Sequence, residues 1–303
     1  MFSARLKAYI LLFLVAVIWG IAGPVIKLTL NGLTPELFLL YRYFISTIAA
    51  IIIIKIAKLH FPRDLRKLGL IILYGLLNST FALWSLFAGL SKTSLLNSSL
   101  ITLLGPILVI FIGYIFLKDH VTKREKLGIF IAVIGSVILT LGPILKIDHG
   151  ESQFVGNLLV AGYVVFTSIA VFIAKKLMRD GISPIFLTNV SFIIGFITMI
   201  PIVLLNNSLF DIWHLAFDLS PAYHAGVWYM ALISGTLAFT LNNMGQKTIE
   251  VSEAALFSYL YPIFSAILAV LVLGDKLTPA IIIGGAITFL GVAIAEIKKK
   301  RYN

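Results

Sequence analysis

The chain has 303 residues, of which 60% are hydrophobic and 12% are charged, and its formal net charge is +11. This composition excludes an ordinary water-soluble domain, because a soluble globule of this size does not need so much apolar surface. The sequence contains no cysteine, which excludes disulfides, thiol catalysis and cysteine metal sites.

Long apolar runs indicate an all-α, polytopic membrane protein. In hydrocarbon, each backbone N–H and C=O group must find its partner within its own helix, so about twenty consecutive apolar residues predict a spanning helix. The sequence predicts ten transmembrane helices, at residues 8–28, 36–56, 68–89, 94–117, 126–145, 155–175, 185–205, 223–246, 252–273 and 279–297.

The basic residues follow this topology. If the chain starts in the cytoplasm, 19 of the 24 Lys and Arg residues lie at the cytoplasmic ends of the spans. This excess predicts a multi-pass protein of the cell (inner) membrane with both termini cytoplasmic. The charge is then a topology signal, so the expected partner is the lipid bilayer and no nucleic acid. The first span has no convincing cleavage site and is expected to be retained.

The first span contains Trp19, Gly20, Gly23 and Pro24 within an otherwise ordinary apolar helix. Small residues allow close helix packing, and a proline frees a carbonyl and can bend the helix. Two interpretations stay open: simple packing with an aromatic side chain near an interface, or a bent helix that lines a substrate path.

The second span starts with Thr34 and Pro35, a cap residue followed by proline at the first helical position. Arg42 follows about two turns into the span, at a depth where a charge costs a few kcal/mol. It could anchor a carboxylate or phosphate, or it could extend to the outer interface. The neighbouring Tyr41 and Tyr43 favour the interface interpretation.

Polar side chains recur along one face of the eighth span. Thr236, Thr240, Asn243 and Lys247 follow the spacing i, i+4, i+7 and i+11. A polar stripe faces other helices or water rather than lipid, and a matching, more aromatic face on the third span indicates a shared central cavity. That face and the polar positions of the fourth and ninth spans are Thr80, Trp84, Phe87, Ser91, Ser94, Ser98, Thr102 and Ser258.

Capping signals mark the junctions before the fifth and tenth spans. Thr122 and Glu125 form a predicted capping box, and Thr278 precedes a proline. Asp119 and Asp275 come just before these starts and are expected to stabilise helix N-termini. The connection 206–222 carries several large apolar residues and is expected to lie on the membrane surface.

Residues 75–140 and 231–296 align without a gap, with 15 of 66 positions identical. The alignment pairs Pro106 with Pro262 and Asp119 with Asp275, and an offset of 149 instead of 156 extends it to Lys27 and Lys176. We therefore predict two repeats, residues 1–147 and 148–303. Five spans in each is an odd number, so the second repeat enters the membrane inverted.

Taken together, these motifs resemble the EamA-type transporters of the drug/metabolite transporter superfamily over nearly the whole chain. Two positions depart from that pattern: Asp119 and Asp275 replace the usual Glu, and Lys118 replaces the usual Gly. The resemblance implies ten helices in two inverted five-helix halves around a central cavity, and transport of small metabolites, often amino acids, frequently outward. The motifs that carry it are Trp19-Gly20, Lys27, Arg42, the two proline-to-aspartate blocks, and the glycine pairs Gly128/Gly135 and Gly284/Gly291.

The leading hypothesis is a secondary carrier of small metabolites, with amino-acid export as its expected activity and a small-molecule substrate as its partner. Apolar walls with a few orienting polar groups are typical of small-ligand sites, and proline positions supply hinge candidates at Pro24, Pro106 and Pro262. The expected substrate-binding residues are Trp19, Arg42, Asn78, Phe81, Trp84, Thr102, Tyr163, Thr236, Asn243, Ser258 and Tyr259.

No cofactor or metal is expected. The chain lacks a phosphate-binding G-x-x-x-x-G-K-[ST] loop, and no acid or histidine falls at the centre of a span. These absences favour facilitated diffusion or exchange over proton coupling. One chain encloses a complete cavity, so a monomer suffices and a dimer stays open.

Three alternatives remain. A carrier of phosphorylated or nucleotide-linked metabolites would use Arg42, Lys27 and Lys92. A membrane-embedded enzyme would need a nucleophile–base pair or a metal cluster that the spans do not offer, so no enzymatic activity is expected. A non-transporting receptor or scaffold would leave the matching polar stripes without a role.

Overall fold

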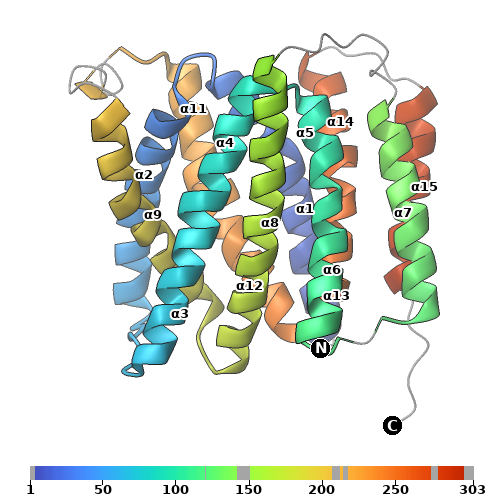
Figure 1. The fold of residues 1–303 in the computed structure, drawn as a ribbon, viewed down its shortest axis with the longest axis horizontal. Helices are drawn as coiled ribbons and strands as arrows, with labels where there is room; N and C mark the ends of the chain where they lie inside the picture. The colour runs from blue at the N-terminus through green and yellow to red at the C-terminus, as the bar shows by residue number, and fades with distance from the viewer. Residues whose placement is uncertain are drawn as a thin grey trace.

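A computed structural model describes residues 4–119, 121–141, 151–206, 212–213, 218–273 and 279–296. These residues form a bundle of long helices that cross the molecule in alternating directions, and none of them is in a β-strand (Figure 1). The helical elements are α1 (Ala4–Thr29), α2 (Pro35–Ile56), α3 (Leu65–Gly75), η1 (Leu76–Ala82), α4 (Leu83–Lys92), α5 (Leu95–Thr102), α6 (Leu104–Phe116), α7 (Lys123–Leu141), α8 (Glu151–Arg179), α9 (Pro184–Asn206), α11 (Pro221–Trp228), η3 (Tyr229–Leu237), α12 (Ala238–Thr248), α13 (Val251–Ala255), η4 (Leu256–Leu260), α14 (Tyr261–Leu273) and α15 (Pro279–Glu296).

Each predicted span corresponds to one helical stretch, and several stretches join two or three elements end to end. Eight stretches of the described chain are long and apolar enough to cross a membrane. The fifth and tenth predicted spans are not among these eight. Helix α7 starts with the charged residues Lys123 to Lys126, and residues 142–145 of that span lie outside the described residues; in α15 a shorter apolar stretch is described, from Ile282 to Ala295. The all-α polytopic fold is confirmed, whereas the number of ten spans stays a prediction.

Helix starts follow the cap signals of the sequence. Thr34 Oγ1 accepts a hydrogen bond of 3.4 Å from Leu37 N at the start of α2. Thr122 Oγ1 accepts from Glu125 N at 3.2 Å, and Thr122 N donates to the Glu125 carboxylate, so the predicted capping box precedes α7.

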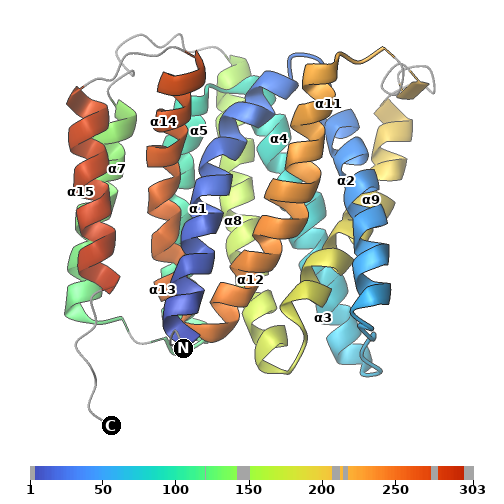
Figure 2. The ribbon, with the colours of Figure 1, turned by 180° about the vertical axis from the view of Figure 1, so that it is seen from behind.

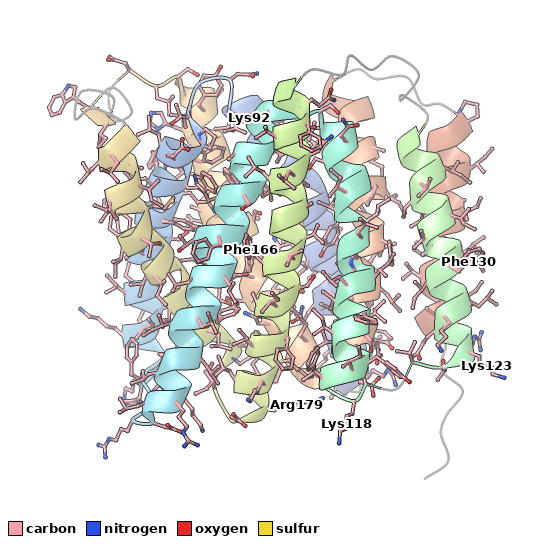
Figure 3. The ribbon with its side chains drawn as sticks, in the orientation of Figure 1. Lys92, Lys118, Lys123, Phe130, Phe166 and Arg179 are labelled. Atoms are coloured by element: carbon pink, nitrogen blue, oxygen red, sulfur yellow. The ribbon has the colours of Figure 1, made fainter. Side chains whose placement is uncertain are left out.

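Helices from the two halves of the chain pack against each other throughout. Helix α2 packs on α9, α1 packs on α12 and α14, and α8 packs on α4 and α6 (Figures 1 and 2). The start of α1 and the end of α15 lie at the same end of the bundle, the lower end in Figure 1. Lys118, Lys123 and Arg179 lie at this lower end and Lys92 at the upper end (Figure 3).

Helices α7 and α15 form a closely packed pair at one side of the bundle (Figure 1). Glycines make this approach feasible: a Cβ at Gly291 would lie 2.8 Å from Gly128 O and would also collide with the backbone of Ala132. Ser136 and Thr288 hydroxyls lie 3.3 Å apart between the two helices. Small residues thus bring the helix backbones into contact, as is typical of helix pairs in membranes.

Candidate functional site

A cavity of about 250 Å³ lies between the two halves of the chain. Its walls come from α1, α2, α3 through α4, α5 with α6, α8, η3 with α12, and α13 through α14. Ile26 and Leu90 lie near the ends of α1 and α4 and Leu95 starts α5, and these helix ends are at the upper end of the bundle. Ala174 and Gln246 lie near the ends of α8 and α12, which are at the lower end (Figure 1). The cavity therefore extends along much of the bundle and needs both halves for its walls.

Most of the side chains that the sequence singled out line this cavity. Trp19 is one of them: its Nε1 donates to Ser234 O at 2.9 Å, and its ring contacts Phe239 and Tyr261 with centroids 4.8 and 5.9 Å apart. The expected site and hinge residues among the lining are Trp19, Arg42, Asn78, Thr102, Tyr163, Asn243, Ser258, Pro106 and Pro262.

The structure places four expected binding residues away from the cavity. Phe81 is 47% exposed on the outside of the bundle and packs on Phe166 (Figure 3). Tyr259 is fully buried in an apolar cluster and is not among the lining residues. Trp84 Nε1 lies 3.4 Å from a Glu36 carboxylate oxygen.

Thr236, the fourth of these residues, donates to Ala231 O at 3.2 Å within its own helix. The hinge candidate Pro24 is buried within α1 and is also not among the lining residues. These residues belong to the packing around the cavity rather than to its wall.

Two π-helical segments explain why the expected polar faces are out of register. Segments η1 and η3 occupy equivalent positions in the two halves, close to the sequence offset of 156. A π-helix bonds i to i+5 and turns more slowly than an α-helix, so a face counted with the 3.6-residue period drifts away from the cavity. Thr80 accordingly contacts Thr198 of α9 at 2.6 Å, while unpredicted residues such as Ser234 and Asn242 line the cavity.

The π-segments also present backbone carbonyls to side chains of neighbouring helices. Ser79 O accepts from the Tyr43 hydroxyl, and Ser234 O accepts from the Trp19 indole. π-Helical segments are frequent at functional sites, since they redirect side chains and leave carbonyls open to other donors. No feature of the residue types marked these segments, so sequence reasoning missed them.

Arg42 is the one charged residue among the described residues that line the cavity. Its side chain is 1% exposed, and none of its three guanidinium nitrogens has a hydrogen-bond partner. The Cζ atom lies 5.6 Å from the ring centre of Phe87, 5.8 Å from Phe192 and 5.9 Å from Tyr43. The interface interpretation of Arg42 was wrong, because the guanidinium is enclosed by aromatic rings instead of reaching the membrane surface.

A lysine lies near each end of the cavity and donates to the backbone at a helix C-terminus. Lys27 Nζ donates to Leu90 O at 2.6 Å and to Thr93 O at 2.9 Å, at the end of α4. The buried Lys175 Nζ donates to Gln246 O and to Ile249 O, the latter at 2.7 Å, at the end of α12. The two sets of acceptor carbonyls are related by the offset of 156.

These bonds correct the alignment of the first helices of the two halves. Lys27 is structurally equivalent to Lys175, whereas the sequence alignment paired it with Lys176. Lys176 is exposed on the outside of α8. The offset for these helices is therefore 148, one residue less than the pattern indicated.

Asp119 stabilises a helix start, but not that of the helix that follows it. Its Oδ2 accepts from Ser252 N and Ser252 Oγ, both at 3.1 Å, at the start of α13. Arg179 Nη2 lies 3.7 Å from its other oxygen. Asp119 thus connects α6 to the second half of the chain at the lower end. Asp275 and Thr278 lie outside the described residues.

No group of three or more His, Asp or Glu side chains in the described residues could hold a metal ion. The buried Glu253 carboxylate accepts from Arg5 and from the Tyr9 hydroxyl near the lower end of α1. This contact holds the start of α1 against α13 and leaves the acid away from the cavity.

The fold is thus a polytopic helical bundle with an internal cavity lined by both halves of the chain. The model of the EamA-like transporter family matches residues 6–141 and 154–296. The chain belongs to the EamA-like transporter family, which is a two-repeat fold.

Relatives agree with this membership. The chain is 30% identical over 319 aligned positions to the uncharacterized transporter YyaM of Bacillus subtilis, covering 99% of this chain and 97% of the relative. An uncharacterized transporter of Archaeoglobus fulgidus is 24% identical, and the match covers 97% of this chain and 100% of the relative. A solved crystal structure has the same fold, with a TM-score of 0.76 at 17% identity over 96% of this chain and 97% of that chain.

Proposed function

We propose that the chain is a secondary carrier of small metabolites, amino acids or related compounds, and that it exports them by alternating access. The observation that carries this proposal is the cavity between the two halves, whose walls combine apolar and aromatic side chains with a few amides and hydroxyls. Such a mixture is typical of sites for small ligands. The proposed binding residues are Trp19, Arg42, Asn78, Thr102, Tyr163, Asn243 and Ser258, with Pro106 and Pro262 as bend points.

The cavity size favours a compact substrate. Sites for drug-sized ligands have volumes of roughly 300–1,000 Å³, and this cavity of about 250 Å³ is smaller. A nucleotide-linked metabolite would not fit without a large rearrangement. A small phosphorylated metabolite remains the second candidate, because Arg42 offers a positive charge to an anion.

We place the carrier in the inner membrane with both termini cytoplasmic, at the end of the bundle where Lys118, Lys123 and Arg179 gather (Figure 3). The repeats are residues 1–147 and 148–303. One chain supplies the whole cavity wall, so a monomer is sufficient. The cavity lining has no acid or histidine in the described residues, which supports facilitated diffusion or exchange.

Counterflow in liposomes tests the carrier. Purified protein is reconstituted into vesicles loaded with one unlabelled amino acid, and uptake of the same labelled amino acid is measured, for each amino acid in turn. Thr102→Phe fills the cavity and should abolish uptake, whereas Thr248→Phe, at an exposed position at the end of α12, should leave it unchanged. Uptake driven by a proton gradient would contradict uncoupled exchange, and equal uptake by vesicles without protein would contradict the carrier.

A further inference from the structure

We propose that Arg42 is an anion anchor and that the cavity selects small organic monocarboxylates with a compact apolar body. In this view an amino acid binds through its carboxylate, and its amino group is dispensable. The inference rests on the proposed carrier function and defines the substrate class of the same cavity.

The guanidinium group of Arg42 is buried without a partner. A buried ion without a partner is strongly disfavoured, and proteins normally pair or hydrogen-bond buried charges. Arg42 is 1% exposed with all three nitrogens unbonded, and it is among the residues that line the cavity. Its planar fork of donors matches the two oxygens of a carboxylate. A ligand anion is therefore the partner that the fold leaves out.

Aromatic rings enclose the Arg42 guanidinium. Rings of Tyr43, Phe87 and Phe192 surround the guanidinium at 5.6–5.9 Å. Cation–π attraction partly offsets the lost hydration without consuming the N–H donors. The side chain is thus held in place with its hydrogen-bonding capacity intact, as pre-organised binding requires.

The cavity lining carries a single positive charge among the described residues. Arg42 is the sole charged lining residue in the described part of the chain, and the ammonium groups of Lys27 and Lys175 are already bonded to backbone carbonyls. One positive charge balances one carboxylate. A phosphate monoester carries about −1.5 to −2 at neutral pH, so part of its charge would be buried without a partner.

The amino group of a bound amino acid would have no charged partner in the cavity. No Asp or Glu is among the described lining residues, so an ammonium group finds no ion pair there. The cavity offers it only neutral acceptors such as the Asn243 and Ser258 side chains. The carboxylate should therefore dominate recognition.

The experiment uses a matched set of ligands on the full-length protein in detergent. Thermal-shift titrations compare leucine, 4-methylpentanoate (leucine without its amino group), leucinamide and isoamylamine, together with inorganic phosphate and glycerol 3-phosphate. A ligand that binds only the folded state raises its melting temperature. We expect the largest shift with 4-methylpentanoate, a smaller shift with leucine, whose ammonium group finds no ion pair among the described lining residues, and none with the other four compounds.

Variants then assign the effect to the guanidinium. Arg42→Gln should weaken carboxylate affinity by about 30-fold or more, the range for truncating one partner of a buried charge pair. The ligand-free variant should melt no lower than the wild type, because an unpaired buried charge is removed. Arg42→Lys keeps the charge but not the fork, so it should bind more weakly with the same ligand preference. Arg66→Gln, at an exposed position in α3, is the matched control.

The outcomes separate this inference from the proposed carrier function. Equal stabilisation by isoamylamine and leucine, a preference for the phosphates, no shift with either carboxylate, or unchanged affinity in both Arg42 variants would overturn the anchor. Counterflow of amino acids that survives Arg42→Gln would leave the carrier standing and refute the anchor. Carboxylate binding that depends on Arg42 without any counterflow would do the reverse.

Discussion

Replacing Lys175 by methionine should open the lower end of the cavity. The ammonium donates to Gln246 O, to Ile249 O at 2.7 Å and, over a longer 3.4 Å, to Lys247 O. Hydrogen bonds that involve a charged group contribute about 1.5–3 kcal/mol each, so the two shorter bonds contribute roughly 3–6 kcal/mol. Part of this lost stabilisation is offset, because the substitution also removes the cost of keeping the ammonium group desolvated.

We expect a net loss of about 2 kcal/mol in the closed state of that end, which shifts the ratio of closed to open molecules by about 30-fold. Lys27→Met should act on the upper end, where Lys27 donates to Leu90 O and Thr93 O. The two substitutions are therefore expected to shift the same equilibrium in opposite directions.

Thiol labelling measures this equilibrium against a clean background, because the chain has no cysteine. A single reporter, Thr167→Cys, lies on the cavity wall. A membrane-impermeant maleimide is applied from one side or the other in oriented vesicles. Lys175→Met should accelerate labelling from the side of the lower end and slow it from the opposite side, and Lys27→Met should do the reverse.

The neighbouring Lys176→Met is the matched control, since Lys176 is exposed and the sequence alignment favoured it over Lys175. It should leave labelling unchanged from both sides. The reasoning is refuted if Lys27→Met and Lys175→Met change labelling in the same direction, or if Lys176→Met reproduces the effect of Lys175→Met.

Further predictions concern stability, measured as shifts in melting temperature. Lys118 has φ 58° at the position where the family pattern has glycine, so Lys118→Gly should stabilise by about 0.5–1 kcal/mol, and a loss would contradict left-handed strain. Asp119→Ala should destabilise by about 2–4 kcal/mol because it removes two bonds to Ser252, and Asp119→Asn, which keeps an oxygen acceptor, should be milder; equal losses would show that the negative charge, and not an acceptor alone, is required. Gly291→Ala should cost about 1–3 kcal/mol by overpacking, whereas Gly69→Ala, with open space around it, should be neutral or stabilising.

Local signals in the sequence were sufficient for the helices and their caps. Thr34 and Thr122 act within three residues of their own position, so a reader of the chain needs no tertiary information to find them. The cavity itself was also within reach, because polar groups in an apolar span must face protein or water. Trp19, Asn78 and Asn243 therefore reached the candidate site by composition and depth alone.

The failures come from contacts between distant segments. Tyr41 and Tyr43 suggested a membrane interface beside Arg42, but the rings that enclose Arg42 include Phe87 and Phe192 from other helices. Asp119 precedes α7 in the chain and nevertheless caps α13, 133 residues away. Neither partner is visible until the helices are packed.

The lysine contacts at the two ends of the cavity are equivalent in the structure, but comparison of the two halves of the sequence does not reveal them. Lys27 and Lys175 bond to backbone carbonyls, and every residue has one, so Leu90 can correspond to Gln246 without any loss of the interaction. Such a contact depends on the lysine and on the helix end, not on the side chains of the residues that supply the acceptors. The two lysine contacts are therefore related by the repeat in the structure, although the sequence alignment does not pair the two lysines.

Charge inside the cavity, by contrast, is not symmetric. The positions equivalent to Arg42 in the second half, at either offset, are Val190 and Ser191, and both are uncharged. In the proposed alternating-access carrier, the two ends of the cavity open in turn and one binding site serves both open states. The repeated contacts of Lys27 and Lys175 fit the first requirement. A second guanidinium would hold a second anion and leave the lone-carboxylate state unbalanced. We therefore expect the two halves to share the lysine contacts at the ends of the cavity, and only the first half to carry a guanidinium at the binding site.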